Sequence, residues 1–160
     1  KFVFETVGYN LEGNELGAAF GIVQLEKLTN NIASRRKNFD LQCEFFSKHS
    51  RYFTNPIELN DSETGWLAFP ILINKNAPFT RREFQIFLEN RNIQTRVVFT
   101  GNVLRQPMCK NINNKVQPMG CPNADYVMEA GVLLPVHHGM TEPMFARLHQ
   151  TIEEFLRQKC

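Results

Sequence analysis

Apolar residues recur every three or four positions near the start of the chain, a spacing that places side chains on one face of an α-helix. They are Leu16, Ala19, Phe20, Val23, Leu25, Leu28 and Ile32. The pattern predicts a long helix over about 14–46. Because glycine costs about 1 kcal/mol against alanine inside a helix, we expect another element to pack closely against the backbone at Gly17 and Gly21.

Three later segments are rich in β-branched and aromatic residues, which favour strands. They are WLAFPILI (66–73), IQTRVVF (93–99) and GVLLPV (131–136). Pro70 lies inside the first of them, so we expect an edge position or a bulge there. The segment 49–65 is polar and contains Pro56, which predicts an irregular connection.

A capping box begins the helix predicted over 81–91. Thr80 has the hydroxyl of a good N-cap, and Glu83 follows three positions later, where its carboxylate can reach back to the cap. The buried face of this helix is expected to consist of Phe84, Ile86, Phe87 and Leu88.

The rest of the chain alternates between loop and helix signals. A loop rich in Asn, Pro, Lys and Gly is expected over 100–121, followed by a short helix at 123–130. An amphipathic helix at 141–156, capped by Thr141, ends the chain. Helices therefore alternate with strands, which predicts an α/β fold around a small sheet.

Composition indicates a soluble globular protein. The 160 residues are 42 % apolar and 21 % charged, with a net charge of +2. That length suits one domain, and no apolar run approaches the roughly 20 residues that span a bilayer. The basic groups at 35–37 and 81–82 are interpreted as solvated helix faces rather than a nucleic-acid contact.

The cysteines and the first residues bear on the cellular context. No two cysteines form a C-x-x-C pair, which argues against a zinc knuckle or a disulfide framework; they are Cys43, Cys109, Cys121 and Cys160. We expect reduced thiols in the cytoplasm. The opening KFVFETVGYN has no export signal and no initiator methionine, so we expect a fragment of a longer polypeptide.

Histidines and carboxylates give no catalytic set. His137 and His138 are adjacent in an extended segment, so they point to opposite sides and are poorly placed to chelate one metal. His49 and His149 are expected at the surface. Glu153 and Glu154 are interpreted as a salt-bridging helix face with Arg157.

Nucleophile and phosphate motifs are also missing from the sequence. Cys109 lies beside Lys110, which can lower a thiol pKa, but no histidine is near in sequence. There is no P-loop, G-x-G-x-x-G, G-x-S-x-G or H-E-x-x-H motif. We therefore predict no catalytic residue and no metal ligand in this chain.

The segment RVVFTGNVLRQP (96–107) is the best binding candidate. A β-branched run is followed by Gly101, and the amide of Asn102 and the guanidinium of Arg105 then come close together. Such donors suit a polar or anionic ligand. The alternative for Arg105 is a loop arginine in solvent.

Two segments resemble a known enzyme family. VGYNLEGNELGAAFGIVQLEKL (7–28), with RRKNF at 35–39, resembles the start of the C-terminal region in the DegT/DnrJ/EryC1/StrS family. Its members are pyridoxal-phosphate sugar aminotransferases and dehydratases with the aspartate-aminotransferase (fold type I) architecture. The residues in register are Gly8, Tyr9, Asn10, Glu15, Ala18, Ala19, Gly21, Gln24, Leu25, Lys27 and Leu28.

The second segment, TRVVFTGNVLRQP (95–107), is similar to the nucleotide-sugar 3-dehydratase branch, as in CDP-4-keto-6-deoxyglucose 3-dehydrases. Those enzymes remove the 3-hydroxyl of 4-keto-6-deoxy nucleotide sugars in deoxysugar and O-antigen lipopolysaccharide biosynthesis. Family aminotransferases tend to carry a histidine motif at this place. A sugar aminotransferase and a non-catalytic interaction module that pairs through the glycine-spaced helix remain the alternatives.

The resemblance implies a domain organisation. Residues 1–50 would be a long helical segment leading from a large cofactor domain, and 51–160 a small C-terminal α/β domain with a mainly antiparallel sheet. The full-length enzyme would be a homodimer that binds a nucleotide-diphosphate sugar. The large domain would carry the lysine of an aminotransferase or the histidine of a 3-dehydratase at the cofactor. One dehydratase subgroup also uses a 2Fe-2S cluster whose cysteines lie upstream of this region.

Site residues are implied at three positions. Asn10 matches the family asparagine that reaches the pyridoxal phosphate (or pyridoxamine phosphate) of the neighbouring subunit, and the alternative is a turn residue. Asn102 and Arg105 match the dehydratase loop that faces the substrate. The chain departs from the family pattern after Gly8-Tyr9-Asn10. The positions that follow are usually basic and hydroxylic in the family, but here they include the acid Glu12.

Overall fold

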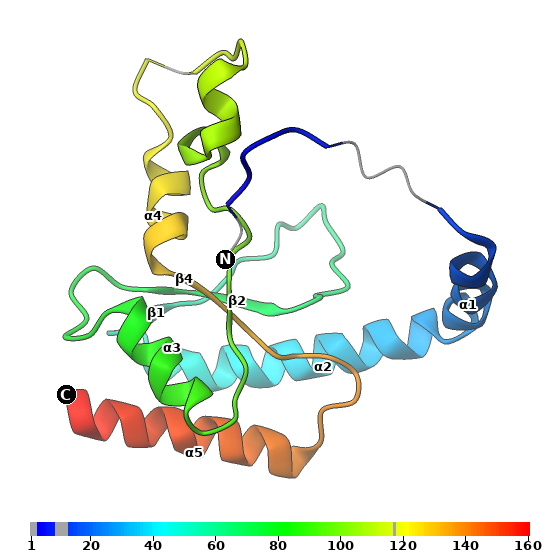
Figure 1. Cartoon of the computed structure of the whole chain (residues 1–160). Helices are drawn as coiled ribbons and strands as arrows, with labels where there is room; N and C mark the ends of the chain where they lie inside the picture. Colours follow the sequence, from blue (N-terminus) through cyan, green and yellow to red (C-terminus); the bar gives the residue numbers. More distant parts are fainter. Residues whose placement is uncertain (1–2, 9–12, 117) are drawn as a thin grey trace.

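The computed structural model describes residues 3–8, 13–116 and 118–160. Its elements follow one another around a small sheet (Figure 1). They are α1 (Glu15–Glu26), α2 (Leu28–Ser47), β1 (Phe53–Thr54), β2 (Phe69–Ile73), α3 (Arg81–Glu89), β3 (Arg96–Val97), the 3-10 turns η1 (Val103–Arg105) and η2 (Pro107–Asn111), α4 (Pro122–Ala130), β4 (Gly131–Leu134) and α5 (Glu142–Lys159).

The strands form a sheet of order β1-β2-β4-β3 in which every pairing is antiparallel. Ile71 of β2 lies opposite Val132 of β4. Arg96 of β3 lies opposite Leu133 on the other side of β4. The predicted α/β fold with a small antiparallel sheet flanked by helices is confirmed.

One face of the sheet carries the hydrophobic core. Residues alternate along β2, and Phe69, Ile71 and Ile73 are buried, as expected when successive side chains point to opposite faces. Helices α2, α3 and α5 lie on one side of the sheet in Figure 1, whereas α4 rises from the other. The buried cluster joins β2 and β4 to these three helices mainly through phenylalanines and leucines.

The predicted helix over 14–46 is wrong in one respect, because it divides at Lys27 into α1 and α2. Helix α2 reaches the core through Phe39, Phe45 and Phe46, whereas α1 buries no residue. The side chains of Leu16 and Phe20 in α1 are 85 % and 69 % exposed.

The expected close packing at the α1 glycines is not found in the described part of the chain. A Cβ added at Gly21 meets nothing within 4 Å. A Cβ added at Gly17 meets only the Asn14 side chain, at 3.3 Å. That asparagine is the N-cap of α1 and accepts a hydrogen bond from the Gly17 N–H at 2.7 Å.

Strands are shorter than the sequence predicts. The segment predicted as an irregular connection contains β1, and the second predicted strand is reduced to the two residues of β3. At Pro70 only β4 pairs with β2, because β1 reaches no further than Leu72. A missing N–H is tolerated where a strand has one neighbour.

The capping box at α3 is confirmed. The Glu83 N–H donates to Thr80 Oγ1 at 3.3 Å, and the Thr80 N–H donates to Glu83 Oε2 at 2.8 Å. Lys159, near the end of α5, binds the same carboxylate at 2.6 Å, and these bonds lower the Glu83 pKa to about 2. Phe84 and Leu88 are buried as predicted, but Ile86 is exposed.

His149 is not a surface residue as predicted, because it lies half-buried between α5 and α2. Its ring stacks on Phe45 with centroids 3.9 Å apart. Its Nε2 lies 2.8 Å from Gln42 Oε1, and Gln42 donates its amide N–H to the Pro135 carbonyl. Nε2 therefore carries the proton in the neutral ring. Phe145 lies one helical turn earlier, on the same apolar face.

The residues after β3 pass very close to α4. Gly101 has φ +66°, and a Cβ added there would lie 2.2 Å from Met128 Cβ and 2.5 Å from Met128 Cα. Only glycine combines that backbone conformation with this approach. Gly120 has φ +69°, but a Cβ added there meets nothing within 4 Å.

We expect Gly101→Ala to unfold at a lower denaturant concentration than Gly120→Ala. Both substitutions place alanine at positive φ, at a cost of about 1 kcal/mol. Only the first also forces α4 and the loop apart, which adds about 1–3 kcal/mol. Urea unfolding of both variants measures the difference, and equal losses would contradict the close approach.

Stability should also fall as the pH falls from about 6.5 to about 4. Burial lowers the His149 pKa from 6.5 to about 4, so in this window the unfolded chain binds a proton that the folded chain does not. The charged neighbours of the ring are Glu44, Lys48, His49 and Glu153. The slope of unfolding free energy against pH should be shallower in His149→Gln. The exposed His138, changed to Gln, serves as control, and equal slopes in both variants would count against the buried ring.

Candidate functional site

The loop after β3 turns sharply before it enters η1. The Phe99 N–H donates to the Val97 carbonyl and the Gly101 N–H to the Val98 carbonyl, both at 2.9 Å. Phe99 itself has φ +43°, an outlier for a bulky residue. Its side chain is 66 % exposed.

Asn102 is buried, with 4 % of its surface exposed. Its Oδ1 accepts a hydrogen bond from the Leu104 N–H at 3.0 Å and so caps η1. Its Nδ2 donates to Oδ1 of Asp125 on α4 at 2.8 Å. Both polar groups of Asn102 are therefore engaged within the fold.

Arg105 is held by the same carboxylate. Its Nε donates to Asp125 Oδ1 at 2.9 Å and its Nη2 to Oδ2 at 2.8 Å, a bidentate pair. The bonds from Arg105 and then from Asn102 lower the Asp125 pKa to about 2. The Arg105 side chain is 63 % exposed, and its Nη1 has no hydrogen-bond partner among the described residues.

The structure thus brings two of the three predicted site residues together. The third, Asn10, lies outside the described residues, as does Glu12. Sequence reasoning missed Asp125, which follows Arg105 by twenty residues. Its one local signal is an acid in the first turn of the predicted short helix, where a carboxylate is favoured anyway.

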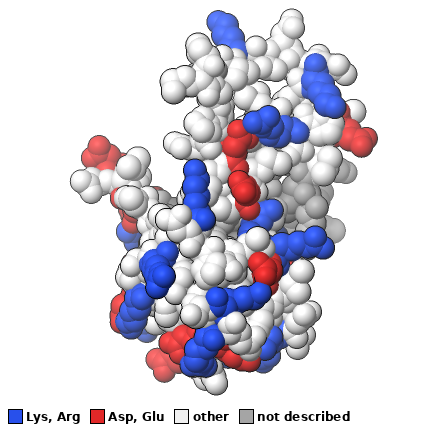
Figure 2. Space-filling model, turned by 90° about the vertical axis from the view of Figure 1, so that its left-hand side faces the viewer, with Lys and Arg blue, Asp and Glu red and all other residues white. Residues whose placement is uncertain are grey.

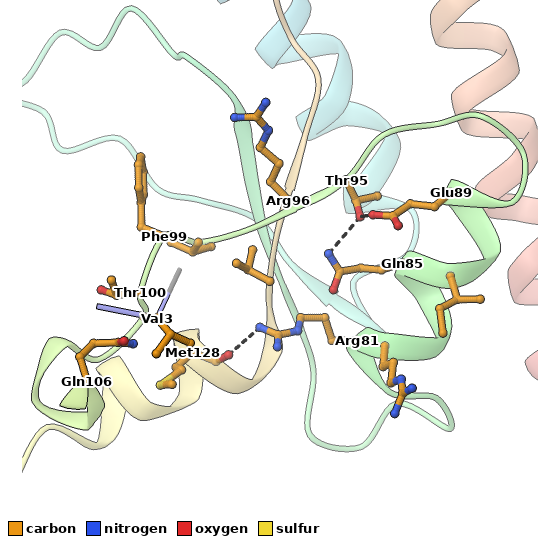
Figure 3. Close-up of a pocket in the computed structure, with 15 residues that line it drawn as sticks. Val3, Arg81, Gln85, Glu89, Thr95, Arg96, Phe99, Thr100, Gln106 and Met128 are labelled. Atoms are coloured by element: carbon orange, nitrogen blue, oxygen red, sulfur yellow. Dashed lines mark hydrogen bonds between the residues drawn. The ribbon is translucent and has the colours of Figure 1, made fainter. Parts of the chain in front are cut away.

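A pocket of 510 Å³ opens beside the loop, between α3, β3 and α4 (Figure 3). We call it the α3–β3 pocket. Phe99, Thr100 and Gln106 lie on one side of it, and Gln85 and Glu89 on the other. The remaining lining residues are Val3, Arg81, Arg82, Ile86, Thr95, Arg96, Val97, Val98, Gly101 and Met128.

Hydrogen bonds fix parts of the pocket wall. Gln85 Nε2 donates to Thr95 Oγ1 at 3.0 Å, and Thr95 Oγ1 donates to Glu89 Oε1 at 2.9 Å. Arg81 crosses the pocket in Figure 3 and donates from Nη1 to the Met128 carbonyl of α4.

The interpretation of Arg81 and Arg82 as one solvated pair is wrong for Arg81. Arg81 is half-buried, and burial lowers the pKa of its guanidinium. Arg82 is exposed, as predicted. Figure 2 shows basic side chains interspersed with acidic ones on the face that it draws.

The other candidate residues do not gather into a site in the part of the chain that the structure describes. The described residues contain no group of three or more His, Cys, Asp or Glu side chains that could hold a metal ion. His137 and His138 are exposed. Glu154 pairs with Arg91 at 2.9 Å rather than with Arg157. The four cysteines are free thiols, and burial raises the Cys43 pKa to about 11.

A second pocket, of 630 Å³, shares Arg96, Val97 and Phe99 with the α3–β3 pocket. Its lining is mainly apolar, with residues such as Leu67, Ile93, Leu133 and Met144, and includes His137, Arg96 and Arg147.

None of the described helices is long and apolar enough to cross a membrane.

Comparisons with known proteins agree with this architecture. The chain is 33 % identical over 156 residues to a dTDP-4-dehydro-2,6-dideoxy-D-glucose 3-dehydratase of Saccharopolyspora spinosa, across 98 % of this chain and 33 % of the relative. It is 28 % identical over 155 residues to the lipopolysaccharide biosynthesis protein RfbH of Salmonella typhimurium, across 97 % of this chain and 35 % of that protein. The chain thus spans about a third of the length of these relatives.

Solved structures of related enzymes have a similar fold. The E. coli GDP-4-keto-6-deoxy-D-mannose-3-dehydratase with bound hydrated PLP superposes with a TM-score of 0.78 at 28 % identity, covering 90 % of this chain and 36 % of that one. The family model of the DegT/DnrJ/EryC1/StrS aminotransferase family matches residues 1–153. The fold therefore corresponds to a C-terminal portion of fold type I enzymes, and the chain belongs to the DegT/DnrJ/EryC1/StrS family.

Proposed function

We propose that this chain is the C-terminal part of a pyridoxal-phosphate-dependent nucleotide-sugar 3-dehydratase, which removes the 3-hydroxyl of a 4-keto-6-deoxy sugar. The observation that carries the proposal is the 33 % identity to a 3-dehydratase along almost the whole chain. The similarity to a lipopolysaccharide biosynthesis protein supports a role in deoxysugar or O-antigen synthesis. The full-length enzyme is proposed to work in the cytoplasm as a homodimer.

The cofactor is proposed to be held mainly by residues outside this chain. Pyridoxal phosphate, when bound, supplies an electron sink for loss of the hydroxyl. Asn10 is the one residue here assigned to it, as an amide donor to the cofactor phosphate of the neighbouring subunit. Because Asn10 lies outside the described residues, we attach no geometry to that contact. Any 2Fe-2S cluster would be bound upstream.

The loop at 96–107 is proposed to face the substrate. Arg105 is the direct donor, because its Nη1 and most of its side chain remain exposed after Asp125 is bound. A guanidinium in that state can bind a phosphate or sugar oxygen. A direct contact by Asn102 would require one of its two internal bonds to be exchanged, so we propose that it contributes to binding by holding the loop.

The exposed face of α1 supports the proposed division of the chain. Residues 1–50 would lead from a large cofactor domain, and 51–160 would form the small domain. Apolar side chains such as Leu16, Phe20 and Leu25 are uncovered on α1 in the described structure. Surfaces of this kind usually mark an interaction site, and the large domain is the proposed cover.

Two other functions are consistent with particular observations. The family is named as an aminotransferase family, so a sugar aminotransferase is the second candidate. The uncovered α1 helix favours, as a third, a non-catalytic module that pairs through this helix.

Cofactor binding by the full-length protein tests the proposal. We expect a visible absorbance band of bound pyridoxal phosphate and loss of the 3-hydroxyl from a 4-keto-6-deoxy nucleotide sugar. An amino sugar formed with glutamate as donor would identify the aminotransferase instead. A preparation that stays colourless with added cofactor would refute both enzymes. The 160-residue chain alone should show no turnover.

Arg105→Ala should raise the KM of the full-length enzyme for the nucleotide sugar about tenfold, because a charge-assisted hydrogen bond is lost. The cofactor spectrum should not change. Asp125→Asn should raise KM by a smaller factor, because the guanidinium remains but is no longer held by two bonds.

Glu154→Gln is the matched control for the Asp125 variant. It also breaks an arginine–carboxylate pair, but this pair joins α5 to Arg91, just after α3, and lies outside the loop at 96–107. Its KM should equal that of the unchanged enzyme. An unaltered KM in Arg105→Ala would refute the direct contact.

A further inference from the structure

Gln106 lies where the turn η1 passes into η2, directly after Arg105. Its N–H donates to the Val103 carbonyl and its carbonyl accepts from the Cys109 N–H, both at 3.0 Å. A residue before proline is restricted to extended conformations, and Gln106, which precedes Pro107, has φ −80° and ψ 141°. Its backbone therefore closes both turns, and only its side chain remains for contacts outside them.

The side chain of Gln106 reaches a segment near the other end of the chain. The residue is buried, with 5 % of its surface exposed. Its Oε1 accepts a hydrogen bond at 3.1 Å from the N–H of Phe4, 102 positions earlier in the sequence. The Met108 N–H donates to the Phe4 carbonyl at 3.0 Å. Both backbone polar groups of Phe4 are thus bound by residues 106–108, so the segment at 3–8 is attached to the end of the loop at two points.

The loop at 96–107 therefore has two different anchors. One is α4, through the Asp125 carboxylate. The other is the segment that precedes α1, through Gln106. Figure 3 shows Val3, which belongs to that segment, on the same side of the α3–β3 pocket as Gln106. This segment is also the part of residues 1–50 that would lead from the proposed large domain.

We propose that Gln106 is a positioning residue for the substrate and acts through Arg105. By tying the loop to the segment at 3–8, it makes the direction of the adjacent guanidinium depend on the large domain as well as on α4. A donor that is held from two sides is already oriented when the nucleotide sugar binds, so less conformational freedom is lost on binding. This inference deepens the proposed function and rests on it for the substrate and for the large domain.

A purely structural role for Gln106 would give a different result, and Gln42 provides the comparison. Gln42 is also a buried glutamine, with 0 % of its surface exposed. Its amide donates to the Pro135 carbonyl at 3.4 Å and its Oε1 lies 2.8 Å from His149 Nε2, contacts that involve neither the loop nor the segment at 3–8. Gln42→Met and Gln106→Met should both lower the denaturation midpoint, because each leaves a buried polar group without its partner. Only Gln106→Met should change substrate binding.

Hydrogen exchange in the full-length protein, without ligands, tests the attachment itself. Methionine is similar to glutamine in size but lacks the oxygen that accepts the Phe4 N–H. Gln106→Met should therefore speed exchange in the segment at 3–8 about fivefold, the effect of losing one hydrogen bond. Gln42→Met should leave exchange in this segment unchanged. Equal exchange in Gln106→Met and the unchanged protein would overturn the proposal.

Steady-state kinetics of the full-length enzyme tests the effect on the substrate. Gln106→Met should raise the KM for the nucleotide sugar about threefold and leave kcat unchanged, because Arg105 keeps its charge but its loop loses one anchor. Phe4→Pro removes the donor of the same hydrogen bond and should give the same KM. The double variant should be no worse than either single one. Phe4→Ala keeps the N–H and is the control, with an unchanged KM.

One further combination shows whether Gln106 acts through Arg105. Gln106→Met in the Arg105→Ala background should leave KM at the value of Arg105→Ala alone, since the direction of a missing guanidinium has no effect. A further rise in KM, or an unchanged KM in both Gln106→Met and Phe4→Pro, would overturn the proposal even if the enzyme turns over. A protein without cofactor binding or turnover would refute the proposed function, while hydrogen exchange would still decide whether Gln106 holds the segment.

Discussion

The carboxylate of Asp125 is the point on which the candidate site depends. It accepts hydrogen bonds from Asn102 and Arg105, and with a pKa of about 2 it stays ionised at neutral pH. The loop can reach it because Gly101 allows the backbone to pass against Met128. The Met128 carbonyl in turn holds Arg81, so α4 connects the loop to the far wall of the pocket. A shift of α4 would therefore change both at once.

Elements with local signals could be predicted from the sequence. Thr80 and Glu83 specify the start of α3 by themselves, and the alternation along β2 specifies its buried face. Other features have no local signal. β1 is two residues long and exists through pairing with β2. The break at Lys27 separates a helix that packs into the core from one that buries no residue, and no glycine or proline marks this break in the sequence.

The site was predictable only in part, for the same reason. The donors of the loop, Asn102 and Arg105, could be found because they lie only three positions apart in sequence. Their partner Asp125 could not, because the fold joins positions twenty residues apart. Arg81 and Arg82 are adjacent and look alike in sequence, but neighbouring helix residues point about 100° apart. One therefore turns toward α4 and the other toward solvent.

The choice between a dehydratase and an aminotransferase depends on how the sugar is held rather than on how the nucleotide is recognised. Relatives of both kinds in this family are named for nucleotide sugars, so recognition of the nucleotide would serve a dehydratase and an aminotransferase equally. A difference between them must therefore come from contacts to the sugar and from the residue that faces the cofactor. Within this chain, the segment on which the sequence-based preference for a dehydratase rests is the loop at 95–107, which contains Arg105. The preference for dehydration thus depends on the sugar end of the site, where Asp125 already fixes the direction of the guanidinium.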